Sequence, residues 1–191
     1  MCDFSVMMLG SGPSGKSAIT IRFVQDFFEA NFDPIIEHVY RRTIKIDDKN
    51  IQFSILDIGG SDDFSALRIS FRRKANAFII VYAIDSRWSF EGVKSWYRDI
   101  KLNRGIILDP VFLCGNKCDQ EDVRVVSKTE GEDLAKKLGA TFFETSALNN
   151  TNITEMFTEL AKEILNRKNY MTQANQAKKE KILNKEICKI F

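Results

Sequence analysis

The sequence predicts an α/β domain with a mostly parallel sheet, helices on both faces and one antiparallel edge strand. From residue 77 onward, apolar runs of strand length alternate with helical patterns. Such alternation is typical of parallel strands joined by crossover helices. Earlier in the chain, two strand-like runs flank a short polar turn at 47–50, which indicates a hairpin and supplies the antiparallel edge.

Each element has its own pattern. Continuous apolar runs at 77–84 and 111–116 predict strands that are buried on both faces. Ser127 and Glu130 have the spacing of a capping box, which opens a helix that ends near residue 138. The other predicted strands are 4–9, 39–46, 51–57 and 141–144, and the other predicted helices are 16–28, 62–73 and 88–102.

The last predicted helix begins at Ile153, where apolar residues recur every three or four positions. Asn152 and Glu155 fit its N-cap and N3 positions. After about Asn169 the apolar pattern stops, and we expect a mobile tail. The predicted organisation is therefore a domain over 1–168 followed by a flexible basic tail over 169–191.

Composition excludes several classes of protein. The 44% hydrophobic and 28% charged fractions are those of a soluble globular chain and exclude whole-chain disorder. A net charge of +2 argues against a nucleic-acid partner. The apolar run at 77–84 is too short to span a bilayer, and the first ten residues lack the basic start of a signal peptide.

The chain has four cysteines, at positions 2, 114, 118 and 188. Cys114 and Cys118 have three residues between them and no histidine nearby in the sequence. This spacing argues against a zinc site or a redox pair, so we expect free thiols.

Residues 10–17, GSGPSGKS, match the phosphate-binding motif G-x-x-x-x-G-K-[ST], with a strand before it and a helix after it. The helix N-terminus offers free N–H groups and partial positive charge to a phosphate. Lys16 should reach the β- and γ-phosphates, and Ser17 should bind Mg²⁺. The alternative is an ordinary glycine-rich turn. Pro13 has no N–H, so we expect weaker stabilisation of the transition state than a glycine or alanine would allow.

Residues 116–119, Asn-Lys-Cys-Asp, follow a buried strand at its C-terminal end, where open α/β sheets bind ligands. Asp119 can accept hydrogen bonds from N1–H and the 2-amino group of guanine, whereas adenine presents the wrong edge. The stem of Lys117 can lie over the base, and Asn116 can tie loops together. The alternative is a polar turn at the strand end.

These motifs, with the segments at 31–40, 56–64 and 122–148, resemble the small GTPases of the Ras superfamily, nearest to the Ras and Rap branches. The similarity covers about residues 4–168. It implies a P-loop G domain with a six-stranded sheet. It also implies a GTP/GDP switch that uses Mg²⁺ and hydrolyses GTP slowly.

The resemblance also implies roles for single residues. Lys16, Gly60 and Ser61 match catalytic positions, and Ser17 and Asp57 match the magnesium positions. Phe28 matches an aromatic residue that packs against guanine, although it can also be an ordinary core residue. The nucleotide-binding residues implied are Gly12, Pro13, Ser14, Gly15, Lys16, Ser17, Ala18, Phe28, Gly60, Asn116, Lys117, Asp119, Ser146 and Ala147.

Several positions depart from the family pattern. Ile35 stands where the family has a threonine that binds Mg²⁺ in the GTP state, so we expect a weak nucleotide-driven change in 29–38. Ser61 stands where most members have a glutamine that orients the attacking water. Leu148 replaces a usual lysine. Together, Pro13, Ile35 and Ser61 predict that nucleotide binding is retained while GTP hydrolysis and switching are impaired.

The resemblance implies three kinds of protein partner: effectors, an exchange factor and an activating protein. We expect a monomer. His38 stands where aspartate is usual, and it is either an exposed edge residue or a determinant of an altered effector set. The predicted effector-facing residues are Phe32, Asp33, Pro34, Ile35, Ile36, Glu37, His38, Val39 and Tyr40.

The chain ends Cys188-Lys-Ile-Phe191, which fits a C-a-a-X prenylation signal, although lysine at the first "a" is atypical. From Arg167 onward there are seven basic and two acidic residues, a charge of +5, which leaves −3 for the rest. Such a tail suits an anionic surface. We therefore expect a lipid anchor on the cytoplasmic face of a membrane, in the first instance the plasma membrane.

Two other functions remain open. One is a guanine-nucleotide-binding interaction module with little or no hydrolysis or switching, which Pro13 and Ile35 favour. The other is a P-loop kinase of small metabolites, which the Asn116–Asp119 set disfavours.

Overall fold

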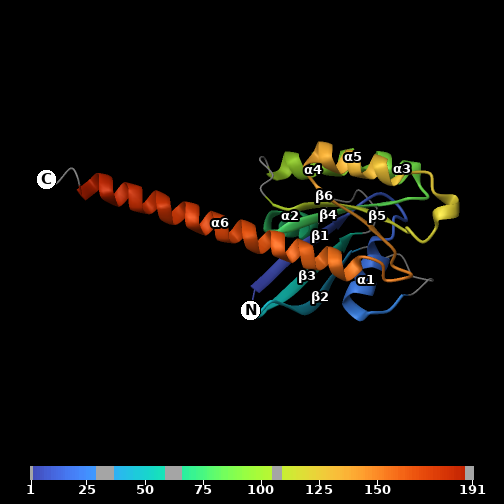
Figure 1. Ribbon diagram of the computed structural model, residues 1–191, viewed down its shortest axis with the longest axis horizontal. Helices are drawn as coiled ribbons and strands as arrows, with labels where there is room; N and C mark the ends of the chain where they lie inside the picture. The colour runs from blue at the N-terminus through green and yellow to red at the C-terminus, as the bar shows by residue number, and fades with distance from the viewer. Residues whose placement is uncertain (1, 29–36, 59–65, 105–108, 188–191) are drawn as a thin grey trace.

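A computed structural model describes residues 2–28, 37–58, 66–104 and 109–187 (Figure 1). The elements in chain order are β1 (Cys2–Leu9), α1 (Lys16–Gln25), β2 (Glu37–Ile46), β3 (Lys49–Ile58), α2 (Ala66–Lys74), β4 (Ala77–Ala83), α3 (Arg87–Glu91), α4 (Val93–Arg104), β5 (Val111–Asn116), a 3-10 turn (Glu121–Val123), α5 (Lys128–Leu138), β6 (Thr141–Thr145) and α6 (Ile153–Ile187).

The six strands form one sheet in the order β2-β3-β1-β4-β5-β6. Four neighbouring pairs are parallel, and only β2 and β3 pair antiparallel, so the predicted fold class is confirmed. Every residue of β4 and β5 is buried, as their continuous apolar runs predict. The hairpin turn is shorter than predicted because Ile46 already pairs with Lys49. Asp47 there adopts a left-handed conformation with φ of 49°.

Helices cover both faces of the sheet, and each face has its own apolar core (Figure 1). Under α1 and α6, Phe23 stacks on Phe157 with ring centres 3.8 Å apart, and Phe53 meets both rings edge-on. On the other face, Tyr82 and its neighbours pack against α4 and α5 through residues such as Val93 and Leu134. The sheet lies between these two cores, and its C-terminal edge carries the predicted motifs at 10–17 and 116–119.

Two predicted helices differ in their boundaries. The helix expected over 88–102 is two helices, α3 and α4, which meet at Gly92. Helix α1 ends at Gln25 rather than near Phe28, because Asp26 adopts a left-handed conformation with φ of 55°. The capping box of α5 is confirmed: the Glu130 N–H donates to the Ser127 hydroxyl, and the Ser127 N–H donates to the Glu130 carboxylate.

The end of the apolar pattern near Asn169 does not mark the end of the helix, and the mobility of the tail stays a prediction. Helix α6 continues without a break to Ile187 and projects away from the sheet (Figure 1). Residues 170–187 contain no glycine or proline and are rich in alanine, glutamine, lysine and glutamate, which favour helix without needing an apolar face. The division into 1–168 and 169–191 remains a prediction.

At the start of α6, the side-chain amide of Asn152 donates to the Glu144 carbonyl at 2.8 Å. Asn152 has φ of 56°, outside the extended region typical of an N-cap residue. None of the described helices is long and apolar enough to cross a bilayer.

Candidate nucleotide-binding site

The phosphate loop joins β1 to α1 at the C-terminal edge of the sheet. Gly10, Gly12 and Gly15 have φ values of 146°, 52° and 89°, a region that disfavours other residues. A Cβ on Gly10 would lie 2.1 Å from the Val81 carbonyl oxygen, and one on Gly15 would lie 2.1 Å from Nδ2 of Asn116. The loop therefore requires glycine both for its backbone conformation and for its close approach to β4 and β5.

Lys16 lies across this loop. Its ammonium donates to the carbonyls of Gly10 at 2.9 Å and Gly12 at 3.2 Å. Burial lowers the pKa of Lys16, while the nearby Asp57 carboxylate acts in the opposite direction. A buried cation encircled by backbone is the arrangement expected of a phosphate-binding lysine.

Asp57 lies on β3 near Lys16 and is 1% exposed. Neither of its carboxylate oxygens has a hydrogen-bond partner of ordinary geometry among the described residues. Burial raises the pKa of Asp57, while the Ser17 hydroxyl, Lys16 and His38 favour its ionised form. A buried carboxylate without a partner, beside a hydroxyl, offers the hard oxygen ligands that suit Mg²⁺. Ser17 and Asp57 therefore fit a magnesium site.

Asn116 joins three segments at the end of β5. Its amide nitrogen donates to the Ser14 carbonyl at 3.0 Å, and its amide oxygen accepts from the Thr145 hydroxyl at 3.2 Å. Asn116 is 2% exposed. The predicted role of this side chain in tying loops together is confirmed by these bonds.

Lys117 has φ of 67°, and its ammonium donates to the Asp85 carboxylate at 2.8 Å. Asp85 follows β4, so this ion pair links the ends of two neighbouring strands. Asp119 is partly exposed in the turn after Lys117. Such a carboxylate at the mouth of the site has room to accept hydrogen bonds from a base.

The third loop of the site follows β6. The backbones of Ser146 and Thr151 bond to each other in both directions, which closes this loop. Arg22 of α1 donates to the carbonyls of Ala147 at 2.7 Å and Leu148 at 2.8 Å. The Arg22 guanidinium also lies 5.9 Å from the ring centre of Phe28. Phe28 is half-buried against the core beneath α1, so both of its predicted roles stay open.

Part of the predicted effector segment lies on β2, the edge strand of the sheet. His38 is exposed there and pairs in register with Asp57, and its ring centre is 4.4 Å from that of Tyr40. The remaining predicted residues Phe32–Ile36, Gly60, Ser61 and Cys188 lie outside the described residues. The roles assigned to Ile35 and Ser61 therefore remain predictions.

Several residues that shape the site were not anticipated from sequence. Arg22 has no local signal, since its contacts come from a loop 125 positions away. Asp85 directly follows the apolar run 77–84, and a polar residue at the end of a buried parallel strand is a signal that points to a site. Trp88 and Trp96 contact the phosphate loop from a helix pair that the sequence predicts as one helix.

Comparison with known proteins assigns this arrangement to a family. The family model described as Ras matches residues 5–166, which is most of the chain. The chain belongs to the Ras family. It is 38% identical to Ras-like protein rasB of Dictyostelium discoideum over 179 residues, which cover 94% of this chain and 89% of that protein.

Two further relatives agree with this assignment. A Ras-like protein of Laccaria bicolor is 38% identical over 162 residues, 85% of this chain and 78% of that protein. Ras-like protein 1 of Saccharomyces cerevisiae is 40% identical over 158 residues, 83% of this chain and 51% of that protein. The chain is thus a Ras-like small GTPase, from a family whose members bind GTP and GDP with Mg²⁺ and hydrolyse GTP.

Proposed function

We propose that this Ras-family protein is a membrane-anchored signalling switch that binds GTP and GDP tightly and hydrolyses GTP slowly. The observation that carries the proposal is the position of Asn116, whose side chain bonds both the phosphate loop and Thr145, the last residue of β6. A single bound nucleotide would contact all of these segments. Contacts made by the base would therefore affect how tightly the phosphates are bound, and contacts made by the phosphates would affect binding of the base.

Each part of the nucleotide would meet a separate set of residues. Lys16 and the backbone N–H groups of 14–17 would bind the β- and γ-phosphates. Ser17 and Asp57 would hold Mg²⁺, which supplies positive charge to neutralise the phosphates. Asp119 would select guanine, with Lys117 beside it. Gly60 is proposed to donate its N–H to the γ-phosphate, on the resemblance alone.

Slow hydrolysis is proposed from the chemistry of three positions. Pro13 removes one N–H from the part of the loop where charge builds up as the phosphate bond breaks. Ile35 has no oxygen with which to bind Mg²⁺ in the GTP state. Ser61 is shorter than glutamine and positions the attacking water less well.

Membrane attachment is proposed through prenylation of Cys188. This cysteine directly follows Ile187, the last residue of α6, so the lipid would sit at the end of a helix that projects from the domain. The basic residues of 167–189 would supply the second signal that a single prenyl chain needs. Effectors would bind along β2 at His38, Val39 and Tyr40, and an exchange factor and an activating protein would control the cycle.

A second function is a nucleotide-binding module that does not hydrolyse GTP. Pro13 favours it, since the proline is exposed at the tip of the phosphate loop and cannot donate a hydrogen bond.

Single-turnover hydrolysis separates the two functions. Purified full-length protein would be loaded with one equivalent of GTP and Mg²⁺, and conversion to GDP followed. A switch converts the GTP over minutes to hours, whereas a module keeps it unchanged. Pro13→Ala restores the missing N–H and adds no bulk, so it should speed conversion. An unchanged rate in Pro13→Ala would contradict the role given to the proline, and failure to retain GTP would contradict both functions.

A further inference from the structure

The junction of α3 and α4 lies against the outer side of the phosphate loop. Three residues of this junction, Trp88, Gly92 and Trp96, are spaced four apart. Residues four apart on consecutive helical turns lie on the same side. From that side Trp88 packs against Gly12, whereas Gly92 and Trp96 both lie against Ser11.

The two tryptophans make different contacts. The indole N–H of Trp96 donates to the Ser11 hydroxyl at 2.9 Å. Trp88 packs its six-membered ring against Gly12, since a Cβ on Gly12 would lie 2.6 Å from Cζ3 of that ring. The rest of the Trp88 side chain is exposed, so its packing contact with the loop accounts for only part of its surface. One contact is thus a directional hydrogen bond and the other is apolar packing.

Gly92 lies between the tryptophans and has a φ of −64°, a conformation open to any residue. Its backbone therefore does not require glycine. The space around it is tight: a Cβ on Gly92 would lie 2.4 Å from the Ser11 hydroxyl oxygen and 3.3 Å from the Ser11 Cβ. A side chain at this position would therefore push the Ser11 hydroxyl out of its place beside Trp96.

We propose that Trp88, Gly92 and Trp96 form a loop seat that holds Ser11 and Gly12 in the nucleotide-binding conformation and so slows nucleotide release. This inference rests on the proposed function, in which the loop binds GTP and GDP. A loop that is already in its bound conformation loses less conformational entropy when it binds. The seat acts next to Pro13, which has no N–H with which to hold itself to a phosphate.

Inside the loop, residues 11–13 have few other constraints. The Gly12 carbonyl accepts from the Ser14 N–H at 2.9 Å and from Lys16 at 3.2 Å. A bound phosphate would compete for Lys16, which would then release this carbonyl. The contacts of the loop seat come from outside the phosphate-binding face, so a bound nucleotide would leave them in place. Trp88, Gly92 and Trp96 are therefore positioning residues rather than nucleotide ligands.

The dissociation rate of labelled GDP from the full-length protein tests the loop seat. Gly92→Ala should speed dissociation about tenfold, since Ser11 must move away. In the Ser11→Gly background the same change should have less than a twofold effect, because the atoms that it meets are gone. Trp96→Phe keeps an aromatic ring and removes the N–H donor. Its GDP dissociation rate should therefore match that of Ser11→Gly. Gly139→Ala is the matched control: Gly139 has φ of 66° and open space around it, so the change strains the backbone far from the loop.

A second measurement does not depend on nucleotide. Amide hydrogen exchange of residues 10–15 in the nucleotide-free protein should be faster in Gly92→Ala and Trp96→Phe than in wild type or Gly139→Ala. Unchanged loop exchange and unchanged GDP dissociation in Gly92→Ala would overturn the loop seat, as would an equal effect of Gly92→Ala in the Ser11→Gly background. Wild-type protein that retains no GDP would overturn the proposed function instead, while the exchange measurement would still decide the seat.

Discussion

The side-chain amide of Asn116 donates to the backbone carbonyl of Ser14 at 3.0 Å, across 102 positions of the sequence. The same amide approaches Gly15 so closely that a Cβ there would lie 2.1 Å from its nitrogen. Asn116 therefore joins the loop that carries Asp119, which is proposed to select the base, to the loop that carries Lys16, which is proposed to bind the phosphates. Asn116 needs no contact with the nucleotide in order to affect binding.

We predict that Asn116→Ala weakens GDP binding at least tenfold and lowers the melting temperature. The substitution leaves the Ser14 carbonyl buried without this partner, and a buried group left unsatisfied costs about 1–3 kcal/mol. The Thr145 hydroxyl loses the same partner but keeps its contact with Cys114 Sγ at 3.1 Å. Each 1.4 kcal/mol lost from binding is about tenfold in affinity. Calorimetric titration with GDP measures the effect, with Asn50→Ala, an exposed position on β3, as the control. Affinity equal to that of the control would contradict the link.

Asp57→Asn should have opposite effects with and without Mg²⁺. In nucleotide-free, Mg²⁺-free protein the variant should melt at a higher temperature, because it removes a buried carboxylate that has no hydrogen-bond partner of ordinary geometry in the described part of the chain. In the presence of GDP, added Mg²⁺ should stabilise the wild type strongly and the variant little. Thermal melts with and without Mg²⁺ test both effects, with Asp3→Asn as an exposed control. A variant that melts lower in both conditions would contradict the magnesium role.

The sequence was most informative where one local pattern determines one element. The apolar runs that became β4 and β5 and the capping box of α5 needed no knowledge of the fold. Where tertiary packing sets the boundary of an element, the sequence pattern did not predict that boundary. Gly92 interrupts the predicted helix 88–102 at a place where the chain must fit against Ser11, and that contact spans most of the N-terminal half of the chain.

The site was predicted in the same uneven way. Lys16 and Asn116 sit in motifs whose spacing reflects their chemistry, and the structure brings both to one edge of the sheet. Arg22 and Trp96 act through loops that are remote in sequence, so no local pattern marks them. Helix α6 was missed from Asn169 onward for the opposite reason. Residues 170–187 continue the helix through their helix propensity alone. The apolar periodicity, which stops near Asn169, therefore predicts a helix that is too short.

Glu130 should make stability depend on acid pH. Its bonds with Arg87 and the Ser127 backbone and hydroxyl lower its pKa from 4.5 to about 2. A group whose pKa is lower in the folded state stabilises the fold above its unfolded pKa and loses that effect as pH falls through the folded value. The stability advantage of wild type over Glu130→Gln should therefore be complete above about pH 4.5 and shrink toward pH 2.

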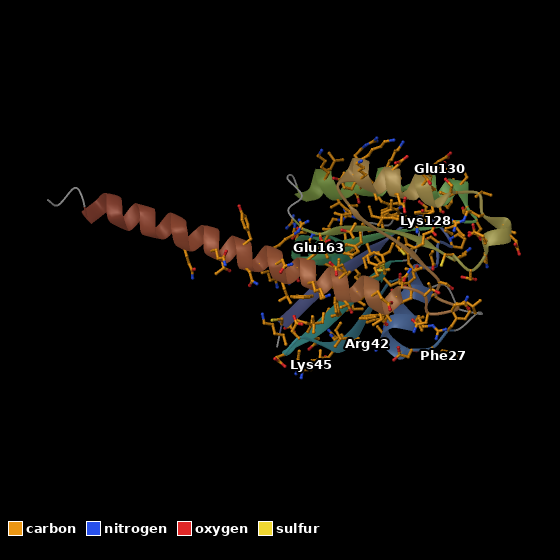
Figure 2. The ribbon with its side chains drawn as sticks, viewed as in Figure 1. Phe27, Arg42, Lys45, Lys128, Glu130 and Glu163 are labelled. Carbon is orange, nitrogen blue, oxygen red and sulfur yellow. The ribbon has the colours of Figure 1, made fainter. Side chains whose placement is uncertain are left out.

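Urea unfolding at a series of pH values measures this advantage. Figure 2 shows Glu130 beside Lys128 at the start of α5. Glu132→Gln serves as the control, since Glu132 is on the same helix and has only a 3.9 Å ion pair with Lys128. A difference between wild type and Glu130→Gln that does not change from pH 6 to pH 2 would contradict the assignment.

Trp88 should report nucleotide binding without any added label. Its ring packs against Gly12, so a phosphate bound in the loop would bring negative charge near the indole while it leaves this packing contact in place. We predict that GDP alters the tryptophan emission of nucleotide-free protein, and that Trp88→Phe loses most of the change. The chain has two tryptophans, so Trp96→Phe isolates the signal of Trp88. If the GDP-induced change in emission persisted in Trp88→Phe and vanished in Trp96→Phe, the signal would come from Trp96 instead of Trp88.

Removing residues 170–191 should remove helix and leave nucleotide binding intact. Helix α6 places 18 residues, 170–187, beyond the predicted domain boundary in helical conformation. At 1.5 Å per residue they form a rod of about 27 Å. The residues of α6 that pack on the core, such as Phe157 and Ile164, lie before the cut. Far-ultraviolet circular dichroism of the full-length and shortened proteins should therefore differ by a helical spectrum, while the GDP affinities should agree.

Ala177→Pro in the full-length protein tests whether those 18 residues form one helix. A proline in a helix interior costs about 3 kcal/mol, and this part of α6 projects away from the sheet. The substitution should reduce the helical signal nearly as much as the truncation does. A matched Ala177→Gln change, which keeps a good helix former, should have no effect. If the truncation instead removed the spectrum of an unfolded chain, residues 170–187 would be the mobile tail that their lack of an apolar face suggests.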